Sequence, residues 1–312
     1  MHQSSLRVED VDLKRVRGFR DLMLAYQRSG GFTAKRLGEA YGILKDMFDD
    51  RECTVFLSFT ADIVATGARG VIRELVQRRL VDVLITTCGS LDHDLARSWG
   101  HYHEGSFSAD DRELDRKGIH RLGNVYIAKT DYGELLEERM QKMLQEVYDE
   151  GTRLVSPSRL WRHIGANLKN SDSILHWAAE NEIPVVVPGP LDGAVGSQLW
   201  FFSELHRDFR LDLFEDQRVL SDLVHEATRT GALIIGGGIS KHHLLWWNQF
   251  RGGLDYAVQI TTAFPWDGSL SGATLSEAIS WGKISPEARM VDVWGEATTL
   301  LPVLIRAILE ET

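Results

Sequence analysis

Short apolar runs that alternate with helical patterns constrain the fold of this chain more than any other feature. Six of these runs are rich in Val and Ile and show no alternation with polar residues: 54–59, 82–87, 124–129, 183–189, 232–238 and 256–262. Strands of this kind are buried on both faces, as in a parallel sheet that helices cover. The sequence therefore predicts a Rossmann-like α/β fold, with a doubly wound, mainly parallel sheet and helices on both faces.

Helical patterns occupy the stretches between these runs. Residues 70–80 place Ile72, Leu75, Val76 and Leu80 on one face of a helix. Residues 133–150 form a longer amphipathic pattern, and residues 215–231 end on Gly231, a residue type that favours helix termination. Because the chain shows no repeat and no linker, we expect a single domain over residues 1–312, with a helical segment 1–50 packed on its edge.

Composition narrows the class of ligand and the compartment. The 312 residues carry a net charge of −10, which disfavours long-range attraction to nucleic acid or anionic lipid. The N-terminal stretch lacks the apolar core of a signal peptide, and no run reaches the ~18 apolar residues of a membrane span. We therefore expect a cytoplasmic protein. Cys53 and Cys88 lie in apolar runs, so we expect buried free thiols rather than a disulfide framework.

A glycine-rich stretch, GALIIGGGISKHH at 231–243, runs from an expected strand into an expected helix. Glycines at the carboxyl end of a strand let the backbone approach a pyrophosphate, although the pattern is not GxGxxG and also fits a tight turn. His242 and His243 point in different directions on a helix, which argues against a shared metal ion. One of them could transfer protons or bind backbone at the helix start.

A second stretch, residues 261–283, leaves a strand, crosses a loop rich in Gly and Ser, and enters a short helix. If that segment is helical, Glu277 and Trp281 share one face, and Lys283 lies just past its end. A carboxylate and an indole face can hold a cation, and a lysine amine can attack a carbonyl-like carbon. The alternative is a capping lysine beside a core tryptophan.

Two further stretches follow strands and carry acidic residues. In TTCGSLDHDLARS at 86–98, Asp92, His93 and Asp94 could cap a helix or line a cationic pocket, but their spacing does not suit zinc. In VPGPLDGAVG at 187–196, Asp192 could bind a ribose hydroxyl or form an Asx-turn with Gly193.

Together these stretches resemble the deoxyhypusine synthase family from about Val16 to the C-terminus. The most specific pieces are GGGISKHH at 236–243 and DYAVQITTAFPWDGSLSGATLSEAISWGK at 255–283, while TTCGSLDHDLARS and DGAVGSQLW look like the archaeal branch. The resemblance implies an NAD-dependent aminobutyl transferase. Its donor is spermidine, its covalent intermediate is an imine on an enzyme lysine, and its acceptor is one lysine of the translation factor 5A precursor.

The resemblance also assigns roles to residues. Lys283 matches the covalent nucleophile, and His242 matches the histidine that transfers protons near the reacting carbon. The residues assigned to the polyamine pocket are Glu277, Trp281, Asp92, His93, Gly268 and Ser269. The residues assigned to NAD are Ala61, Asp62, Ile63, Val64, Ala65, Thr87, Cys88, Gly89, Asp192, Gly237, Thr262, Ala263, Glu296 and Ala297.

This chain departs from the eukaryotic family pattern at several of these positions. Ser197 and Leu270 stand where that pattern has aspartates, His93 replaces a glutamate, and Asp62 replaces an asparagine. Glu296 replaces an aspartate but retains the acceptor for a ribose hydroxyl. The departures concern how the amine is bound, and the carboxylates that could compensate are Asp92, Asp94 and Glu204.

The resemblance further implies a homotetramer, a dimer of dimers with active sites shared across a tight interface. The aromatic-rich stretches 198–205 and 244–250 suit such an interface or a core. Two other functions stay open at this point. A homospermidine synthase would pass the aminobutyl group to putrescine, and a sensor would bind NAD or a polyamine with an inert Lys283.

Overall fold

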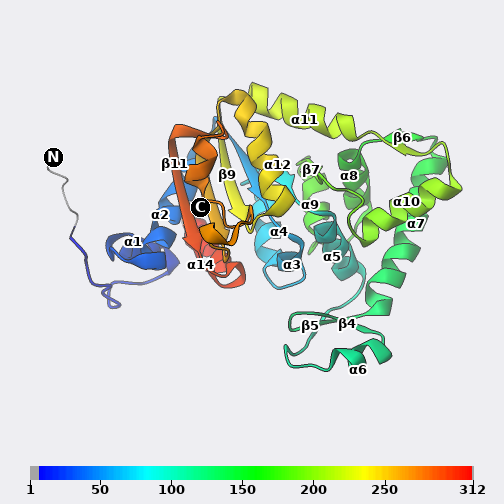
Figure 1. The fold of residues 1–312 in the computed structure, drawn as a ribbon, viewed down its shortest axis with the longest axis horizontal. Helices are drawn as coiled ribbons and strands as arrows, with labels where there is room; N and C mark the ends of the chain where they lie inside the picture. The colour runs from blue at the N-terminus through cyan, green and yellow to red at the C-terminus, as the bar shows by residue number, and fades with distance from the viewer. Residues whose placement is uncertain (1–6, 311–312) are drawn as a thin grey trace. The chain divides into compact units, whose positions relative to one another are not determined.

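The computed structural model describes residues 7–310 and confirms an α/β fold with parallel strands flanked by helices (Figure 1). The described residues fall into two compact units. Unit 1 contains residues 7–58 and 222–310, and unit 2 contains residues 59–221. The single-domain description of residues 1–312 stays a prediction. Within 7–310, no helix combines the length and the apolar character needed to cross a membrane.

Unit 1 is built on four parallel strands in the order β11-β10-β9-β1. Their bounds are Cys53–Ser58 (β1), Arg229–Ile235 (β9), Leu254–Thr261 (β10) and Ile284–Trp294 (β11). The central strand β9 is buried along nearly its whole length, as expected of a strand covered on both faces. Because the strands are parallel, the segments that follow β9, β10 and β11 leave the sheet at the same edge.

Unit 1 also contains helices, some packed on the sheet and some on other helices. They are α1 (Phe19–Arg28), α2 (Phe32–Asp49), α12 (Gly238–Asn248), α13 (Leu275–Ile279) and α14 (Ala297–Leu309). Helix α2 contacts β1, β10 and β11, whereas α12 contacts β1 and β9. The helical N-terminal segment thus corresponds to α1 and α2, and α2 carries a row of buried apolar residues toward the strands.

Unit 2 is mainly helical, with one three-stranded antiparallel sheet and two pairs of parallel strands. Its helices are α3 (Ala61–Val64), α4 (Arg69–Gln77), α5 (Cys88–Trp99), α6 (Asp111–Arg116), α7 (Gly133–Asp149), α8 (Pro157–Asn167), α9 (Ile174–Glu180) and α10 (Ala194–Leu205). Strands β2 (Val83–Ile85) and β7 (Val185–Val186) pair in parallel, as do β6 (Leu154–Val155) and β8 (Arg210–Leu211). The chain passes from unit 2 to unit 1 within α11 (Leu213–Glu226).

Three expectations about single elements were wrong. The run 124–129 is not a strand of the parallel sheet; β5 (Val125–Ala128) pairs antiparallel with β3 (His103–Glu104) and β4 (Ile119–Leu122) and is only partly buried. The helix expected to reach Gly231 ends at Glu226, and Gly231 lies within β9. A Cβ at Gly231 would lie 2.5 Å from the Met47 sulfur, so this glycine permits close packing. The short helix before Lys283 covers only 275–279, which leaves Trp281 outside it.

The sequence patterns missed β11, the longest strand of unit 1. This strand is at the edge of the unit 1 strand order, and its first half is partly exposed. Edge strands tolerate polar residues and proline because one side forms no ladder, and β11 includes Pro286 and Glu287. The apolar pattern that marks a buried strand is therefore missing over Ser285–Arg289.

Candidate active site

The residues of unit 1 assigned to the cofactor lie at one edge of the sheet. Gly237 follows β9, Thr262 and Ala263 follow β10, and Glu296 and Ala297 follow β11. Backbone hydrogen bonds hold these ends together: the Gly236 amide donates to the Ile260 carbonyl at 2.8 Å, and the Gly295 amide donates to the Thr261 carbonyl at 2.9 Å. In open α/β sheets, this carboxyl edge is where ligands bind.

Gly237 is needed for the packing of this edge. A Cβ at Gly237 would lie 2.4 Å from the Cα of Ser271, so only glycine lets the loop 262–274 cross the end of β9. Its neighbours Gly236 and Gly238 have positive φ angles of 79° and 66°, a conformation that favours glycine. The tight-turn interpretation therefore accounts for all three glycines, and a bound nucleotide would make use of a turn that is already formed.

Glu296 is the N-cap of α14. Its carboxylate accepts hydrogen bonds from the Thr298 amide (2.9 Å), the Thr299 amide (3.0 Å) and the Thr298 hydroxyl (2.6 Å). Burial raises the pKa of Glu296, but the hydrogen bonds from Thr298 and Thr299 outweigh it and the net pKa is lowered. The carboxylate is therefore ionised and oriented at the sheet edge.

Unit 2 gathers its own set of residues assigned to the cofactor. Ala61–Val64 form α3, Thr87–Gly89 begin α5, and Asp192 precedes α10. A Cβ at Gly89 would lie 3.0 Å from the Ala61 Cβ, so α3 and the start of α5 are in close contact. Asp62 and Asp192 are exposed, whereas Ile63, Val64, Ala65 and Cys88 are buried and could reach a ligand only through their backbone.

Asp92 is a buried carboxylate that orients the start of α10. It accepts hydrogen bonds from the backbone amides of Ala194 and Val195, both at 2.8 Å, and from the Tyr132 hydroxyl at 3.0 Å. Burial raises the pKa of Asp92, and these donors partly oppose the shift. Asp92 and Asp94 do not cap their own helix, as one interpretation held; they lie inside α5 and bind the first amides of α10 and α9.

His93 is buried beside two tyrosines. Its Nδ1 lies 2.8 Å from the Tyr102 hydroxyl, and the Tyr132 ring packs 5.6 Å away. Burial lowers the pKa of His93 to about 4, with a smaller lowering from the Arg97 charge and an opposing effect of Asp62. At neutral pH this imidazole is uncharged, so it can form a hydrogen bond with an amine but cannot hold it by charge.

Lys283 is fixed by the turn that ends α13. The Gly282 amide donates to the Ile279 carbonyl at 2.9 Å, and the Lys283 amide donates to the Ala278 carbonyl at 3.0 Å. Gly282 has a φ of 68°, so this is a glycine-terminated helix end of the Schellman type. The Lys283 carbonyl then accepts from the Leu254 amide at the start of β10, which holds the residue on both sides.

The amine of Lys283 lies between two indole rings. Its Nζ is 5.3 Å from the ring centroid of Trp281 and 5.6 Å from that of Trp246. Both distances are within the range of cation–π attraction. Trp246 is the site residue that sequence reasoning missed, because it stood in an aromatic run that also suited a core or an interface. Its spacing of four residues from His242 on the same helix could have indicated it.

His242 faces this pair, whereas His243 does not. The His242 ring stacks on Trp246 with a centroid distance of 5.8 Å and an interplanar angle of 22°. Burial lowers the pKa of His242, and the charge of Lys283 lowers it further, so the imidazole is neutral at pH 7 and can accept a proton. His243 is half-buried, and burial lowers its pKa to about 4.

A buried lysine holds the loop 262–274, which carries Gly268 and Ser269. Lys241 is 1% exposed, and its Nζ donates to the Gln259 side chain (2.8 Å) and to the carbonyls of Leu270 (3.0 Å) and Ala273 (2.6 Å). Burial lowers the pKa of Lys241 to about 8, against the opposing charges of Asp292 and Glu277. Gly268 and Ser269 are exposed at the tip of this loop, where Asp267 accepts the Ser269 amide at 2.7 Å.

Comparison with known proteins decides the family. The deoxyhypusine synthase family profile matches residues 21–308. A relative of that name from Picrophilus torridus is 50% identical over 303 residues, covering 97% of each chain. Another, from Thermoplasma acidophilum, is 52% identical over 298 residues and covers 96% of each chain.

This chain belongs to the deoxyhypusine synthase family. Membership makes it an enzyme of the aminobutyl transferase type. A solved structure from Entamoeba histolytica, assigned as a deoxyhypusine synthase, covers 97% of both chains with a TM-score of 0.67 at 20% identity, which supports the fold. AgrE, crystallised with ornithine and NAD⁺, shares the fold alone, with a TM-score of 0.52 at 13% identity over 34% of its length.

Ser197 and Leu270 carry no charge at the two positions where the eukaryotic pattern has aspartates. Ser197 is exposed and its hydroxyl donates to the Gly193 carbonyl at 3.0 Å, while Leu270 contributes its carbonyl to Lys241. Two carboxylates that could have compensated already have cationic partners: Asp94 forms a buried ion pair with Arg69, and Glu204 pairs with Arg207. Glu277 is exposed on α13, and the described part of the chain shows no ion pair to it.

Proposed function

We propose that this enzyme transfers the 4-aminobutyl group of spermidine to a lysine of the translation factor 5A precursor, through an imine on Lys283 and with NAD as cofactor. Family membership supports the aminobutyl transfer. The observation that carries the covalent step is the position of Lys283, whose amine lies between two indoles beside an uncharged His242. We also propose that the enzyme acts in the cytoplasm.

The site residues have distinct roles in binding the amine. Trp246 and Trp281 attract a cation through their ring faces, and the exposed carboxylate of Glu277 on the preceding helix adds a formal charge. His93 supplies a neutral hydrogen-bonding group in place of a family glutamate. Aromatic faces thus take over part of the cation binding that carboxylates perform in the eukaryotic pattern. Asp92 serves as a positioning residue, because its oxygens are engaged by α10 and Tyr132.

The covalent step follows from these positions. When bound, NAD would supply the acceptor for a hydride from the donor carbon beside the secondary amine, which becomes an imine, and the source of hydride for the final imine, so the overall reaction is a transfer. The uncharged His242 accepts a proton near the carbon that reacts. The Lys283 amine adds to that carbon, the carbon–nitrogen bond to diaminopropane breaks, and the leaving amine takes up a proton. The acceptor lysine then displaces Lys283 from the four-carbon unit.

The residues present suit a dinucleotide. Unit 1 would hold it through Gly237, Thr262, Ala263, Glu296 and Ala297, where three parallel strands end together. In unit 2, the residues assigned to the cofactor offer the backbone of 61–65 and 87–89 and the exposed Asp192. Glycine at 237, with no room for a Cβ, keeps this edge compact, and Glu296 presents an oriented carboxylate for a ribose hydroxyl.

We also propose a homotetramer with shared active sites. Lys283 lies just before the amino end of β11, while Glu296 and Ala297 follow its carboxyl end. Seven residue steps along the neighbouring β10 correspond to more than about 20 Å at the usual strand rise. This separation supports a site in which one copy supplies Lys283 and another copy supplies the cofactor edge. Exposed aromatics on α10, Trp200 and Phe201, suit contacts between copies.

A transfer assay tests the function. The purified chain is mixed with NAD and with spermidine labelled in its butyl carbons, and either the factor 5A precursor or putrescine is added. We expect label on one lysine of the factor. Label in putrescine alone, as homospermidine, would replace the proposed acceptor, and that alternative is worth testing because the pocket has lost family carboxylates. Absence of label in both would contradict the transfer itself.

A further inference from the structure

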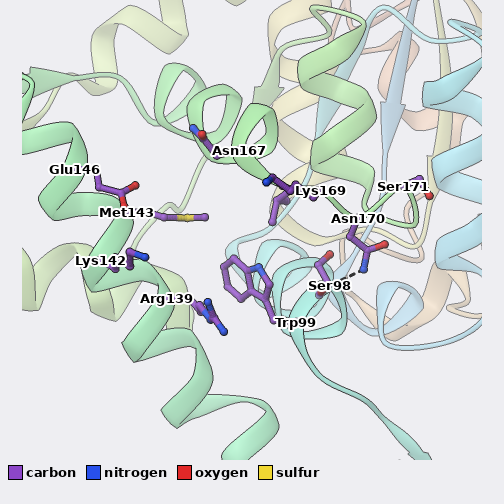
Figure 2. Close-up of a pocket in the computed structure, with 11 residues that line it drawn as sticks. Ser98, Trp99, Arg139, Lys142, Met143, Glu146, Asn167, Lys169, Asn170 and Ser171 are labelled. Carbon is purple, nitrogen blue, oxygen red and sulfur yellow. Dashed lines mark hydrogen bonds between the residues drawn. The ribbon is translucent and has the colours of Figure 1, made fainter.

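A recess in unit 2 has no role in the proposed reaction. It lies between α7 and the segment that joins α8 to α9, and the end of α5 closes one side (Figure 2). Its volume is about 800 Å³, within the range of roughly 300–1,000 Å³ typical of small-molecule sites. None of its lining residues is assigned to the polyamine, the cofactor or the acceptor.

Cationic side chains converge on this recess. Arg139 and Lys142 reach it from α7 and Lys169 from the α8–α9 segment, while Glu146 is the one carboxylate in the lining (Figure 2). Within residues 7–310, Lys142 and Lys169 form no ion pair, and Arg139 has only a 4.0 Å contact with Glu138. Because the chain carries a net charge of −10, three cationic side chains around this recess create an unusual region of positive charge.

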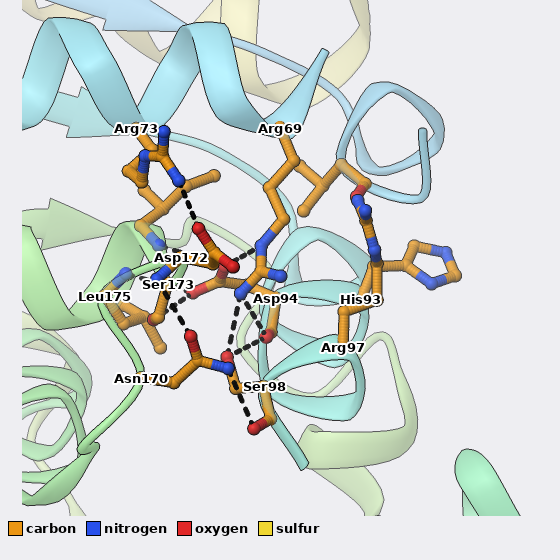
Figure 3. A network of polar contacts seen from close by, with 12 residues as sticks. Arg69, Arg73, His93, Asp94, Arg97, Ser98, Asn170, Asp172, Ser173 and Leu175 are labelled. Carbon is orange, nitrogen blue, oxygen red and sulfur yellow. Dashed lines mark hydrogen bonds and ion pairs between the residues drawn. The ribbon is translucent and has the colours of Figure 1, made fainter. Parts of the chain in front are cut away.

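The wall of the recess is held by a buried polar network (Figure 3). Asp94 accepts from Arg69 (2.7 Å), from the Ser173 hydroxyl (2.7 Å) and from the Leu175 amide (3.0 Å). The Asn170 side-chain amide donates to the Ser98 carbonyl at 3.0 Å, which ties the α8–α9 segment to the end of α5. Lys169 therefore extends from a fixed backbone, and a ligand would meet a preformed surface rather than a mobile loop.

The remaining lining suits a flat ring. Trp99 is half-buried, and its indole lies in the recess between the cations of α7 and the α8–α9 segment (Figure 2). Met143 and the buried Leu168 add apolar surface beside it. Indole faces stack on planar rings, while Arg and Lys pair with phosphate oxygens. Three cations match the two to three charges of a diphosphate better than the single charge of a carboxylate.

We propose that this recess binds a small phosphate-bearing ligand of the nucleoside diphosphate class. Arg139, Lys142 and Lys169 hold the phosphates, and the ring lies against Trp99. The cations and the indole lie around one recess, which suits a compact ligand that carries both phosphates and a ring. The inference concerns a second site and does not depend on the transfer reaction.

Calorimetric titration of the parent chain and of variants at the recess tests the site, because these variants leave the proposed cofactor edge unchanged. The probes are ADP, inorganic pyrophosphate and adenosine. We expect ADP to bind most tightly, pyrophosphate less tightly and adenosine least. Lys142→Glu and Lys169→Glu should each weaken ADP binding about tenfold or more, as loss of a charged hydrogen bond predicts. Lys117→Glu makes the same charge change elsewhere in unit 2 and should leave ADP affinity unchanged.

A further variant separates the ring from the phosphates. Trp99→Leu should weaken ADP severalfold and leave pyrophosphate unchanged, provided that its unfolding transition matches the parent. If Trp99→Leu does not fold, the two exposed lysine variants still decide the question. Equal ADP affinity in Lys142→Glu, Lys169→Glu and Lys117→Glu would overturn the proposal. So would binding of a hexaglutamate peptide in place of ADP. Because the assay measures no aminobutyl transfer, its failure is distinct from failure of the proposed function.

Discussion

At the scale of single residues, the surroundings of Lys283 combine two attractive indoles with few formal charges. A cation–π contact contributes about 0.5–1 kcal/mol at an exposed site and about 2 kcal/mol when desolvated. Trp246 and Trp281 are 44% and 66% exposed in this chain, so a bound amine would cover their faces and strengthen both contacts. The pocket can therefore attract a cationic amine although Ser197 and Leu270 carry no charge.

Substitution of Lys283 tests the covalent step. Borohydride added during turnover should trap an aminobutyl adduct on Lys283, detectable as a mass increase on the peptide that contains it. Lys283→Ala should lose the adduct and all transfer, because it removes the amine that lies beside the two indoles. Lys129→Ala, which removes a lysine of unit 2 that pairs with Asp115, serves as the control and should keep the adduct. An adduct of the same yield in Lys283→Ala would exclude the proposed nucleophile.

Trp246 is expected to determine how tightly the donor amine binds. Trp246→Leu should raise KM for spermidine by about two- to thirtyfold, the range that corresponds to one cation–π contact, while KM for NAD stays unchanged. Trp246→Phe should restore part of the affinity. Trp177→Leu, which removes a half-buried indole from α9, is the control. If KM for spermidine did not rise in Trp246→Leu, the contact would have no role in binding.

At the scale of elements, the loop 262–274 depends on one buried charge. Lys241 joins α12 to this loop and to β10 through three hydrogen bonds, and Gln259 adds another to the Ser271 carbonyl at 2.9 Å. The loop also packs against Gly237 with no room for a Cβ. The positions of Gly268 and Ser269 therefore follow from contacts made by residues that do not themselves face a substrate.

Removal of the Lys241 amine should loosen this loop. Lys241→Met keeps the length of the side chain but leaves three buried acceptors without a donor, so the free energy of unfolding should fall by about 3 kcal/mol. Hydrogen exchange should accelerate over residues 262–274 in particular. Lys117→Met, at an exposed position, is the control for loss of a lysine. Unchanged exchange in the loop of Lys241→Met would contradict the anchoring role.

At the scale of the whole molecule, burial keeps two histidines uncharged at neutral pH, the buried His93 in unit 2 and the half-buried His243 in unit 1. Burial lowers both pKa values from 6.5 to about 4. Between pH 6.5 and pH 4 the unfolded chain therefore binds more protons at these positions than the folded chain does. Linkage then requires that the stability of the fold decreases as pH falls through this window.

Denaturation by urea at pH 7 and pH 5 measures this effect. Between these values, each buried histidine should remove about 2 kcal/mol from the free energy of unfolding. The glutamine of His93→Gln can still form a hydrogen bond with Tyr102. In this variant the free energy of unfolding should fall by about 2 kcal/mol less between pH 7 and pH 5 than in the parent. His101→Gln changes an exposed histidine and serves as the control. A loss on acidification as large in His93→Gln as in the parent would contradict the buried, uncharged state.

Patterns along the chain predicted the parts of the fold that local chemistry decides. Runs of β-branched residues marked β1, β2, β9 and β10, because a strand buried on both faces needs apolar side chains on both. Amphipathic spacing marked α4 and α7. The segments expected to carry cofactor residues do follow strand ends, since parallel strands bring their carboxyl ends to one edge. The residue roles themselves came from the family resemblance and stay predictions.

The tertiary structure alone decided the rest, because it depends on contacts between segments far apart in the chain. The edge strand β11 has no distinctive apolar pattern. It is at the end of the strand order, where it pairs with β10 on one side. Asp92 orients the start of α10, a partner about 100 residues away. Trp246 approaches Lys283 only because α12 and the turn after α13 are folded against one sheet. The sequence by itself determined which residues could hold and attack an amine, and the packing of the sheet decided which of them meet.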